Sequence, residues 1–306
     1  MYAKLGTALI VLALAGCPDG DKNASIEASN KGVEAFTHES WETAITHFKE
    51  AVKLYPGNHQ AWYSLGQVYG KKEDWEQAAK ALEEAVKHGS NDPMYHLWLG
   101  VARYELERQA ADGGQKPNYD PAETALEKAV ELNNDLFRGH WYLGRVYRDT
   151  NRPKLAAEAW TRACMLNPYF GKPFVRLGEL YLRWDKVSEA VQVLSQGKQF
   201  VVDDGDLTNI YYYLGMAYDV EARANPGKGK SRWDASIEAY SQAIDHRADN
   251  DQARFQRGLA YIQKGDRAKG QADLDLYIKR GRGSTFEKQE AMRAMYGVIA
   301  PGAVPP

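Results

Sequence analysis

The feature that most constrains this chain is a regular spacing of glycines within segments of helical pattern. Glycines at one place of a recurring apolar pattern are Gly32, Gly66, Gly100, Gly144, Gly178, Gly215 and Gly258. Consecutive members lie 34, 34, 44, 34, 37 and 43 residues apart. A period of 34 residues with insertions is typical of repeated helical hairpins, each too small to bury its apolar face alone. The spacing therefore predicts an all-α stack of about seven hairpins and no strand.

The clearest copy is the stretch 62–85. Its key positions are Trp62, Leu65, Gly66, Tyr69, Ala78, Leu82 and Ala85. Small side chains at Gly66 and Ala78 let two helix backbones approach, and the larger side chains fill the space around them. This order and spacing resembles the tetratricopeptide repeat (TPR). The resemblance implies a right-handed superhelical solenoid over residues 25–297.

Seven copies can be registered on this template. They span about 25–58, 59–92, 93–136, 137–170, 171–204, 208–250 and 251–283. The third and sixth copies carry insertions, which we expect as polar loops at 110–118 and 222–232, and residues 203–206 are expected to form an extra turn. The seventh copy has Arg254 and Arg257 where apolar residues are usual.

The carboxyl end of the chain continues beyond the last copy. Ser284 and Glu287 form a capping box, which predicts a capping helix over 284–297 that seals the end of the stack. Residues 298–306 are expected to be a disordered tail.

The amino terminus has the features of a secretion signal. Lys4 precedes an apolar run over residues 5–15 that is too short to span a bilayer. Residues 14–17, Leu-Ala-Gly-Cys, resemble a bacterial lipobox. The resemblance implies a lipoprotein signal peptide at 1–16 and acylation of Cys17, with 17–24 as a lipidated tether; the alternative is an ordinary secretory signal with an incidental cysteine.

Nothing in the composition or motifs indicates an enzyme. The formal net charge is −2, which gives no sign of nucleic-acid binding. Residues 224–231 match a relaxed phosphate-loop pattern, but a helix is expected before them where such a loop needs a strand. The seven histidines lack metal-ligand spacing, and Cys164 is expected to be a buried apolar residue. We therefore predict no catalytic residue, no metal and no cofactor, although an unrecognised hydrolase stays as a third possibility.

The functional prediction concerns the concave surface, which the TPR resemblance places on free positions of the first helices. Carried onto this chain, those positions give a basic and aromatic set predicted to bind a partner: Tyr63, Arg138, Trp141, Arg145, Arg148, Lys172, Arg176, Arg183 and Tyr212. Arginine and aromatic side chains dominate binding energetics at interfaces. Lys172 and Arg176 match two basic positions of the carboxylate clamp in chaperone-tail-binding TPR domains, but Tyr142, Leu97 and Val101 depart from the rest of that clamp.

Two hypotheses follow for the function. The first is a non-enzymatic scaffold, lipid-anchored to a membrane and facing the periplasm, that binds an envelope protein or peptide. Its layout is similar to that of TPR lipoproteins that assist type IV pilus secretin assembly, outer-membrane protein assembly or peptidoglycan synthase control. The outer membrane is favoured because Pro18 rather than an aspartate follows Cys17. The second hypothesis is binding of an anionic glycan or lipid of the envelope.

Overall fold

The structure is a computed structural model that describes residues 20–224, 229–281 and 284–296. These ranges contain fifteen α-helices and no strand, which confirms the predicted all-α class. The predicted signal peptide, Cys17 and the tail 298–306 lie outside the described residues, as do residues 225–228 of the phosphate-loop-like segment. The chain divides into two compact units, residues 1–159 and 160–306.

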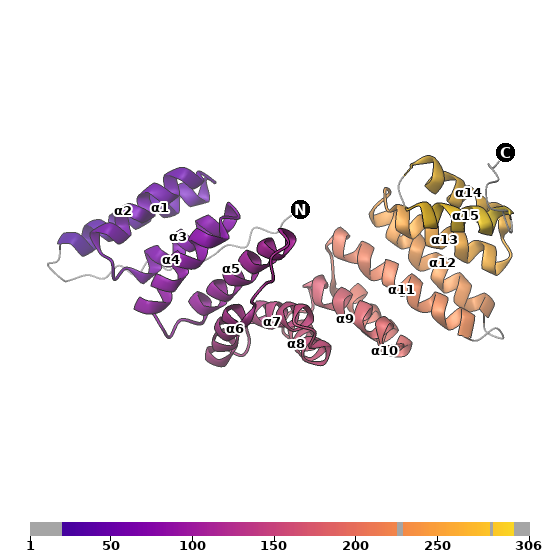
Figure 1. Ribbon diagram of the computed structural model, residues 1–306, viewed down its shortest axis with the longest axis horizontal. Helices are drawn as coiled ribbons and strands as arrows, with labels where there is room; N and C mark the ends of the chain where they lie inside the picture. The colour runs from indigo at the N-terminus through magenta and orange to yellow at the C-terminus, as the bar shows by residue number, and fades with distance from the viewer. Residues whose placement is uncertain (1–19, 225–228, 282–283, 297–306) are drawn as a thin grey trace. The chain divides into compact units, whose positions relative to one another are not determined.

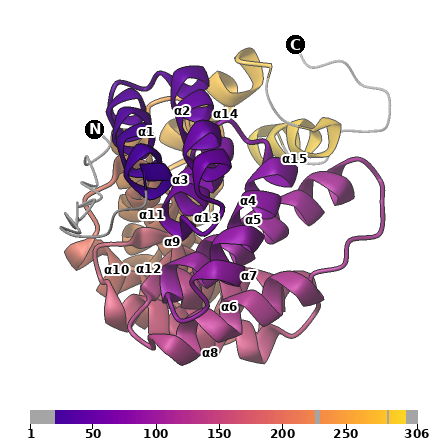
Figure 2. The ribbon, with the colours of Figure 1, turned by 90° about the vertical axis from the view of Figure 1, so that its left-hand side faces the viewer.

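The first unit consists of antiparallel helix pairs (Figure 1). Its helices are α1 (Gly20–Thr37), α2 (Trp41–Leu54), α3 (His59–Lys71), α4 (Trp75–His88), α5 (Pro93–Asp112), α6 (Asp120–Leu132) and α7 (Phe137–Asp149), followed by the start of α8 (Pro153–Leu166). α1 and α2, α3 and α4, and α5 and α6 form hairpins, and the pairing of α1 with α2 is also clear in Figure 2. The first helices of successive repeats, α3, α5 and α7, are neighbours.

The second unit repeats this arrangement. After the end of α8 it contains α9 (Gly171–Arg183), α10 (Val187–Phe200), α11 (Asp204–Ala224), α12 (Gly229–His246), α13 (Asp251–Lys264), α14 (Arg267–Lys279) and α15 (Thr285–Tyr296). The hairpins are α9 with α10, α11 with α12 and α13 with α14. α15 packs on α13 and α14, as expected of a capping helix.

The recurring glycines bring the helices of each hairpin into close contact. A Cβ atom on Gly66 would lie 2.5 Å from Cγ of Leu82, and one on Gly100 would lie 2.5 Å from Cγ of Leu126. The same close approach recurs at Gly32, Gly178, Gly215 and Gly258. A methyl group at these positions would have to displace a buried side chain, so glycine is required by packing rather than by backbone conformation.

The turns inside the regular repeats share one backbone feature. Glu39, Glu73, Asn151 and Asp185 have φ values between 56° and 58°. They stand between the two helices of the first, second, fourth and fifth copies, and Gly265 has the left-handed conformation in the seventh. The third copy has a longer connection at this point, so its insertion replaces this tight turn.

Four expectations about non-helical segments were wrong in part. α1 begins at Gly20, so residues 20–24 are helical rather than tether. α5 extends to Asp112, where Arg108 pairs with Glu105 and Asp112 along the helix, so the third-copy loop is shorter than 110–118. α11 begins at Asp204 and ends at Ala224, and α12 begins at Gly229, so the extra turn and much of the insertion 222–232 are helix.

The polar residues of the seventh copy have partners in the interior. Arg257 makes a bidentate contact with Asp273, at 2.7 and 2.8 Å. Arg254 donates to Asp251 at 3.0 Å, and Arg280 donates to the same carboxylate at 2.8 Å. A buried charge requires such pairing, so ion pairs take the place of apolar contacts in this copy.

Candidate functional site

The first unit presents an aromatic surface along α3, α5 and α7. Tyr63 of α3 lies against Tyr95, with ring centroids 4.9 Å apart, and its hydroxyl accepts a hydrogen bond from Gln67. Burial raises the pKa of Tyr63 to about 12, so the phenol stays protonated at neutral pH. Trp98 and Tyr142, from α5 and α7, are half-buried.

Arg138 places a positive charge on this surface. It is half-buried near the start of α7, with its guanidinium 5.6 Å from the centre of the Phe137 ring. Its positive charge acts to lower the pKa of both Tyr63 and Tyr142, against the larger effect of burial. Among the described residues, Arg138 makes no ion pair with a carboxylate. We define Tyr63, Trp98, Arg138 and Tyr142 as the α7 patch.

Arg145 is held in place by its own surroundings. Its Nη1 donates to Oε1 of Glu105 at 2.7 Å, and its guanidinium lies 4.4 Å from the Tyr104 ring centre and 5.0 Å from that of Tyr142. Glu105 is buried and also accepts from Arg108 at 2.7 Å. The charge of Arg145 is thus compensated internally, and this residue supports the tyrosines of the surface.

Two other predicted residues of this unit are buried or paired within the protein. Trp141 is only 7% exposed, so the expectation that its side chain lies on the open face was wrong. Arg148 pairs with Asp149 at 2.7 Å, and Asp149 also accepts from the hydroxyl of Tyr104 at 2.6 Å. The register placed Trp141 by position alone, and a large apolar ring gains more by burial than by exposure.

Some predicted cations of the second unit also pair with a carboxylate, and one does not. Arg176 and Arg183 both pair with Glu179, at 2.8 and 2.6 Å. Lys172 is exposed at the start of α9 and makes no ion pair with any described carboxylate. Of the six predicted cations, Arg138 and Lys172 therefore have no acidic partner within the described part of the chain.

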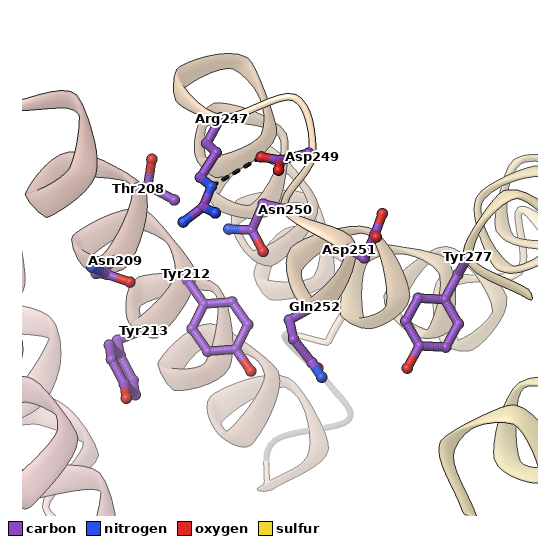
Figure 3. A pocket seen from close by; sticks show the side chains of 10 residues that line it. All are labelled: Thr208, Asn209, Tyr212, Tyr213, Arg247, Asp249, Asn250, Asp251, Gln252 and Tyr277. Carbon is purple, nitrogen blue, oxygen red and sulfur yellow. Dashed lines mark hydrogen bonds and ion pairs between the residues drawn. The ribbon is translucent and has the colours of Figure 1, made fainter. Parts of the chain in front are cut away.

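A cavity of about 380 Å³ lies on the second unit, between α11 and the start of α13 (Figure 3). Tyr212, a predicted residue, lines it together with Asn209 and Tyr213 from the same helix. The loop before α13 contributes Arg247, Asp249 and Asn250, and Gln252 follows at the start of α13. Sequence reasoning missed this second group because it lies in a loop and at a helix start, outside the first-helix positions that the repeat pattern assigns.

A buried carboxyl group lies within the hairpin of α11 and α12. Asp219 accepts hydrogen bonds from the hydroxyls of Ser236 and, at 3.3 Å, Tyr240. Burial raises the pKa of Asp219 from 3.8 to about 6, although Ser236 and Arg223 act in the opposite direction. Tyr240 also contacts Tyr212, with ring centroids 6.0 Å apart, so this network supports one wall of the cavity.

No group of three or more His, Cys, Asp or Glu side chains in the described residues is placed to hold a metal ion. Of the helices that the structure describes, none combines the length and apolar character needed to cross a membrane.

Comparison with known proteins identifies the repeat. Family models described as tetratricopeptide repeat match residues 35–99 and 229–284. Cellulose synthase operon protein C of Escherichia coli K12 is 35% identical over 95 residues, which are 30% of this chain and 8% of that protein. The chain thus spans a small fraction of the length of this curated relative.

Solved structures show the same fold. The C-terminal part of a TPR repeat-containing protein from Cytophaga hutchinsonii covers 87% of this chain and 98% of its own, with a TM-score of 0.65 and 11% identity. PilF of Pseudomonas aeruginosa covers 76% of this chain and 95% of its own, with a TM-score of 0.58 and 17% identity. Residues 35–99 and 229–284 therefore match tetratricopeptide repeats, and the described helices share the solenoid fold of TPR proteins. TPR proteins are in general non-enzymatic scaffolds for protein interaction.

Proposed function

We propose that this protein is a non-enzymatic scaffold of the bacterial envelope that binds an acidic segment of a partner protein at the α7 patch. An acylated Cys17 would hold it at a membrane, facing the periplasm, with the outer membrane favoured. Assembly of an envelope complex, such as a type IV pilus secretin, is the kind of process in which such a scaffold would act. The likeness to PilF supports the fold on which this proposal rests.

The observation that carries the proposal is the state of Arg138. Its neighbours Arg145 and Arg148 each contact a carboxylate within 2.7 Å, whereas Arg138 has no such partner among the described residues. A half-buried guanidinium beside an aromatic ring is weakly hydrated and offers a planar fork of donors to a carboxylate. The patch therefore suits an aspartate or glutamate flanked by an apolar side chain that can lie on Tyr142 or Trp98.

Lys172 extends the same chemistry to the second unit. It is exposed and unpaired within the described residues, and its charge partly opposes the rise in the pKa of Asp206 that burial causes. An exposed ammonium contributes mainly to the rate of encounter with an acidic partner. We therefore expect Lys172 to affect association more weakly than Arg138.

Affinity capture tests the proposal. Detergent-solubilised envelopes would be passed over the wild-type chain, Arg138→Glu and the matched control Lys53→Glu, and retained proteins identified by mass spectrometry. Lys53 lies exposed on α2 without an ion pair to a described acid, so the control makes the same charge change away from the patch. A partner retained by wild type and the control but lost with Arg138→Glu is expected; retention by all three would refute the patch assignment.

The anchor needs a separate experiment. Labelling with radioactive palmitate is expected for the wild-type chain and is expected to disappear with Cys17→Ser. Labelling that persists in this variant would refute acylation of Cys17 and leave the binding proposal unaffected.

An anionic glycan or lipid headgroup is the alternative ligand for the same unpaired cations. Protein-free cell-wall and lipid fractions serve as its probes. Binding to these fractions that is lost with Arg138→Glu, with no protein captured, would replace the protein partner by this ligand.

A further inference from the structure

The cavity between α11 and α13 differs in chemistry from the α7 patch. Its charged lining residues are already paired: Arg247 donates to Asp249 at 2.9 Å, and Asp251 accepts from Arg254 and Arg280. A charged ligand group entering this cavity would lose water without gaining a free counter-charge, which is unfavourable. The cavity thus disfavours both carboxylates and ammonium groups.

The remaining lining groups are uncharged and offer both donors and acceptors. Asn250 caps α13 by accepting from the backbone N–H of Ala253, which leaves its amide N–H groups for a ligand. Asn209 and Gln252 are the reverse case. Their amide nitrogens donate to Gly205 O and to Glu287, which leaves both carbonyl oxygens for a ligand.

Tyrosines supply the apolar walls of the cavity. Tyr212 and Tyr213 are half-buried and meet edge to face, with ring centroids 5.4 Å apart. In Figure 3 the ring of Tyr212 lies between the carboxamides of Asn209 and Gln252, with Asn250 above it. Burial raises the pKa of both phenols, so their hydroxyls are protonated at neutral pH and can donate.

We propose that this cavity binds an uncharged, hydrogen-bonding side chain of a peptide, namely a carboxamide or a phenol. A flat amide or phenol ring can lie on Tyr212 while its polar atoms reach Asn250 and the carbonyl oxygens of Asn209 and Gln252. A site that provides hydrogen bonds to such a group rejects a purely apolar analogue, because its own polar groups would then be left unpaired. This inference rests on the proposed function in that it takes the ligand to be a peptide.

The test uses the full chain carrying Arg138→Glu, so that the α7 patch does not select acidic peptides, and a library of N-acetylated, C-amidated hexapeptides on an array. One position is fixed as Asn, Gln, Tyr, Leu, Asp or Lys, and the other positions are random. The fluorescently labelled chain is expected to prefer peptides with Asn, Gln or Tyr fixed, and the preference is expected to persist at 0.5 M salt, because no net charge is involved. Preference for fixed Asp, Lys or Leu would overturn the inference.

Variants locate the binding in the cavity. Asn209→Ala and Gln252→Ala change exposed side chains and leave the core intact, and Tyr212→Phe removes only a hydroxyl. Each is expected to weaken binding about three- to tenfold, the effect of one lost hydrogen bond. The matched control Tyr218→Phe changes a half-buried tyrosine of α11 outside the cavity and is expected to have no effect. Unchanged binding in all three cavity variants would overturn the inference.

The outcomes separate this inference from the proposed function. If Arg138→Glu abolishes capture of the envelope partner but the library shows no preference for uncharged polar residues, only the cavity assignment fails. If the cavity variants weaken peptide binding but Arg138→Glu changes nothing, only the α7 patch fails. Binding of N,N′-diacetylchitobiose with the same sensitivity to the cavity variants, and no bound peptide, would replace the peptide by a glycan and overturn this inference, while the capture experiment still decides the α7 patch.

Discussion

Neutralising Asp219 is expected to stabilise the protein at neutral pH. Burial raises the pKa of this carboxyl group from 3.8 to about 6, so the folded state holds a proton that the unfolded state releases between those values. The free energy of unfolding therefore falls as pH rises from about 4 to about 6. A rise of about two pH units in pKa, at 1.36 kcal/mol each, corresponds to about 3 kcal/mol once Asp219 is ionised.

The variant Asp219→Asn removes this loss because its side chain is uncharged. Its carbonyl oxygen can still accept from Ser236, and its amide nitrogen can donate to the hydroxyl oxygen of Tyr240. Urea unfolding followed by circular dichroism at pH 4, 5, 6 and 7 gives the difference between variant and wild type at each pH. We expect that difference to change by about 2 to 3 kcal/mol in favour of the variant from pH 4 to pH 7. The control Asp245→Asn, on the exposed side of α12, is expected to stay within about 0.5 kcal/mol of wild type. A pH-independent difference for Asp219→Asn would refute the account of this buried carboxyl group.

Three further predictions concern packing, the buried ion pair and the thiol. Gly100→Ala places a methyl group 2.5 Å from Leu126 and should destabilise the protein by about 1–3 kcal/mol in thermal or urea unfolding; equal stability would show that the hairpin can relax. Glu105→Gln leaves Arg108 and Arg145 without their shared carboxylate and should lower the free energy of unfolding, measured with urea, by about 3 kcal/mol. Glu131→Gln removes an exposed ion pair and should lower it by less than about 1 kcal/mol; equal losses for the two variants would contradict the buried pairing. Burial raises the pKa of the Cys164 thiol, so in a Cys17→Ser chain it should react with Ellman's reagent only when urea unfolds the protein; fast reaction in the native state would contradict its buried position.

Much of the fold could be predicted because the repeat pattern records packing directly. Gly66 and Leu82 had to be small and large at fixed positions for two helices to touch, and the close contact between them confirms this. The boundaries near Asp112 and Asp204 were wrong because glycine-rich and acidic segments were taken as loops. Arg108 and its acidic partners extend α5, a local stabilisation that repeat register does not reveal.

The candidate site was less predictable because register gives a position on a helix but not the contacts of a side chain. Arg138, Arg145 and Arg148 occupy comparable places, yet two of them are paired with Glu105 and Asp149. Glu105 lies 40 residues before Arg145, so no local pattern links them. The cavity beside Tyr212 was missed for a related reason, since Asn250 and Gln252 belong to a helix start that the repeat pattern leaves undefined.

Binding of an acidic partner at the α7 patch can be tested most directly by one measurement. The partner retained from solubilised envelopes would be purified and titrated by calorimetry against wild type, Arg138→Glu and Lys53→Glu at 0.15 M salt. Loss of a buried arginine contact at an interface costs about 2 kcal/mol or more, so Arg138→Glu should raise Kd at least about tenfold. The control Lys53→Glu should leave Kd within about twofold of wild type. An equal Kd for Arg138→Glu and Lys53→Glu would contradict binding at the α7 patch.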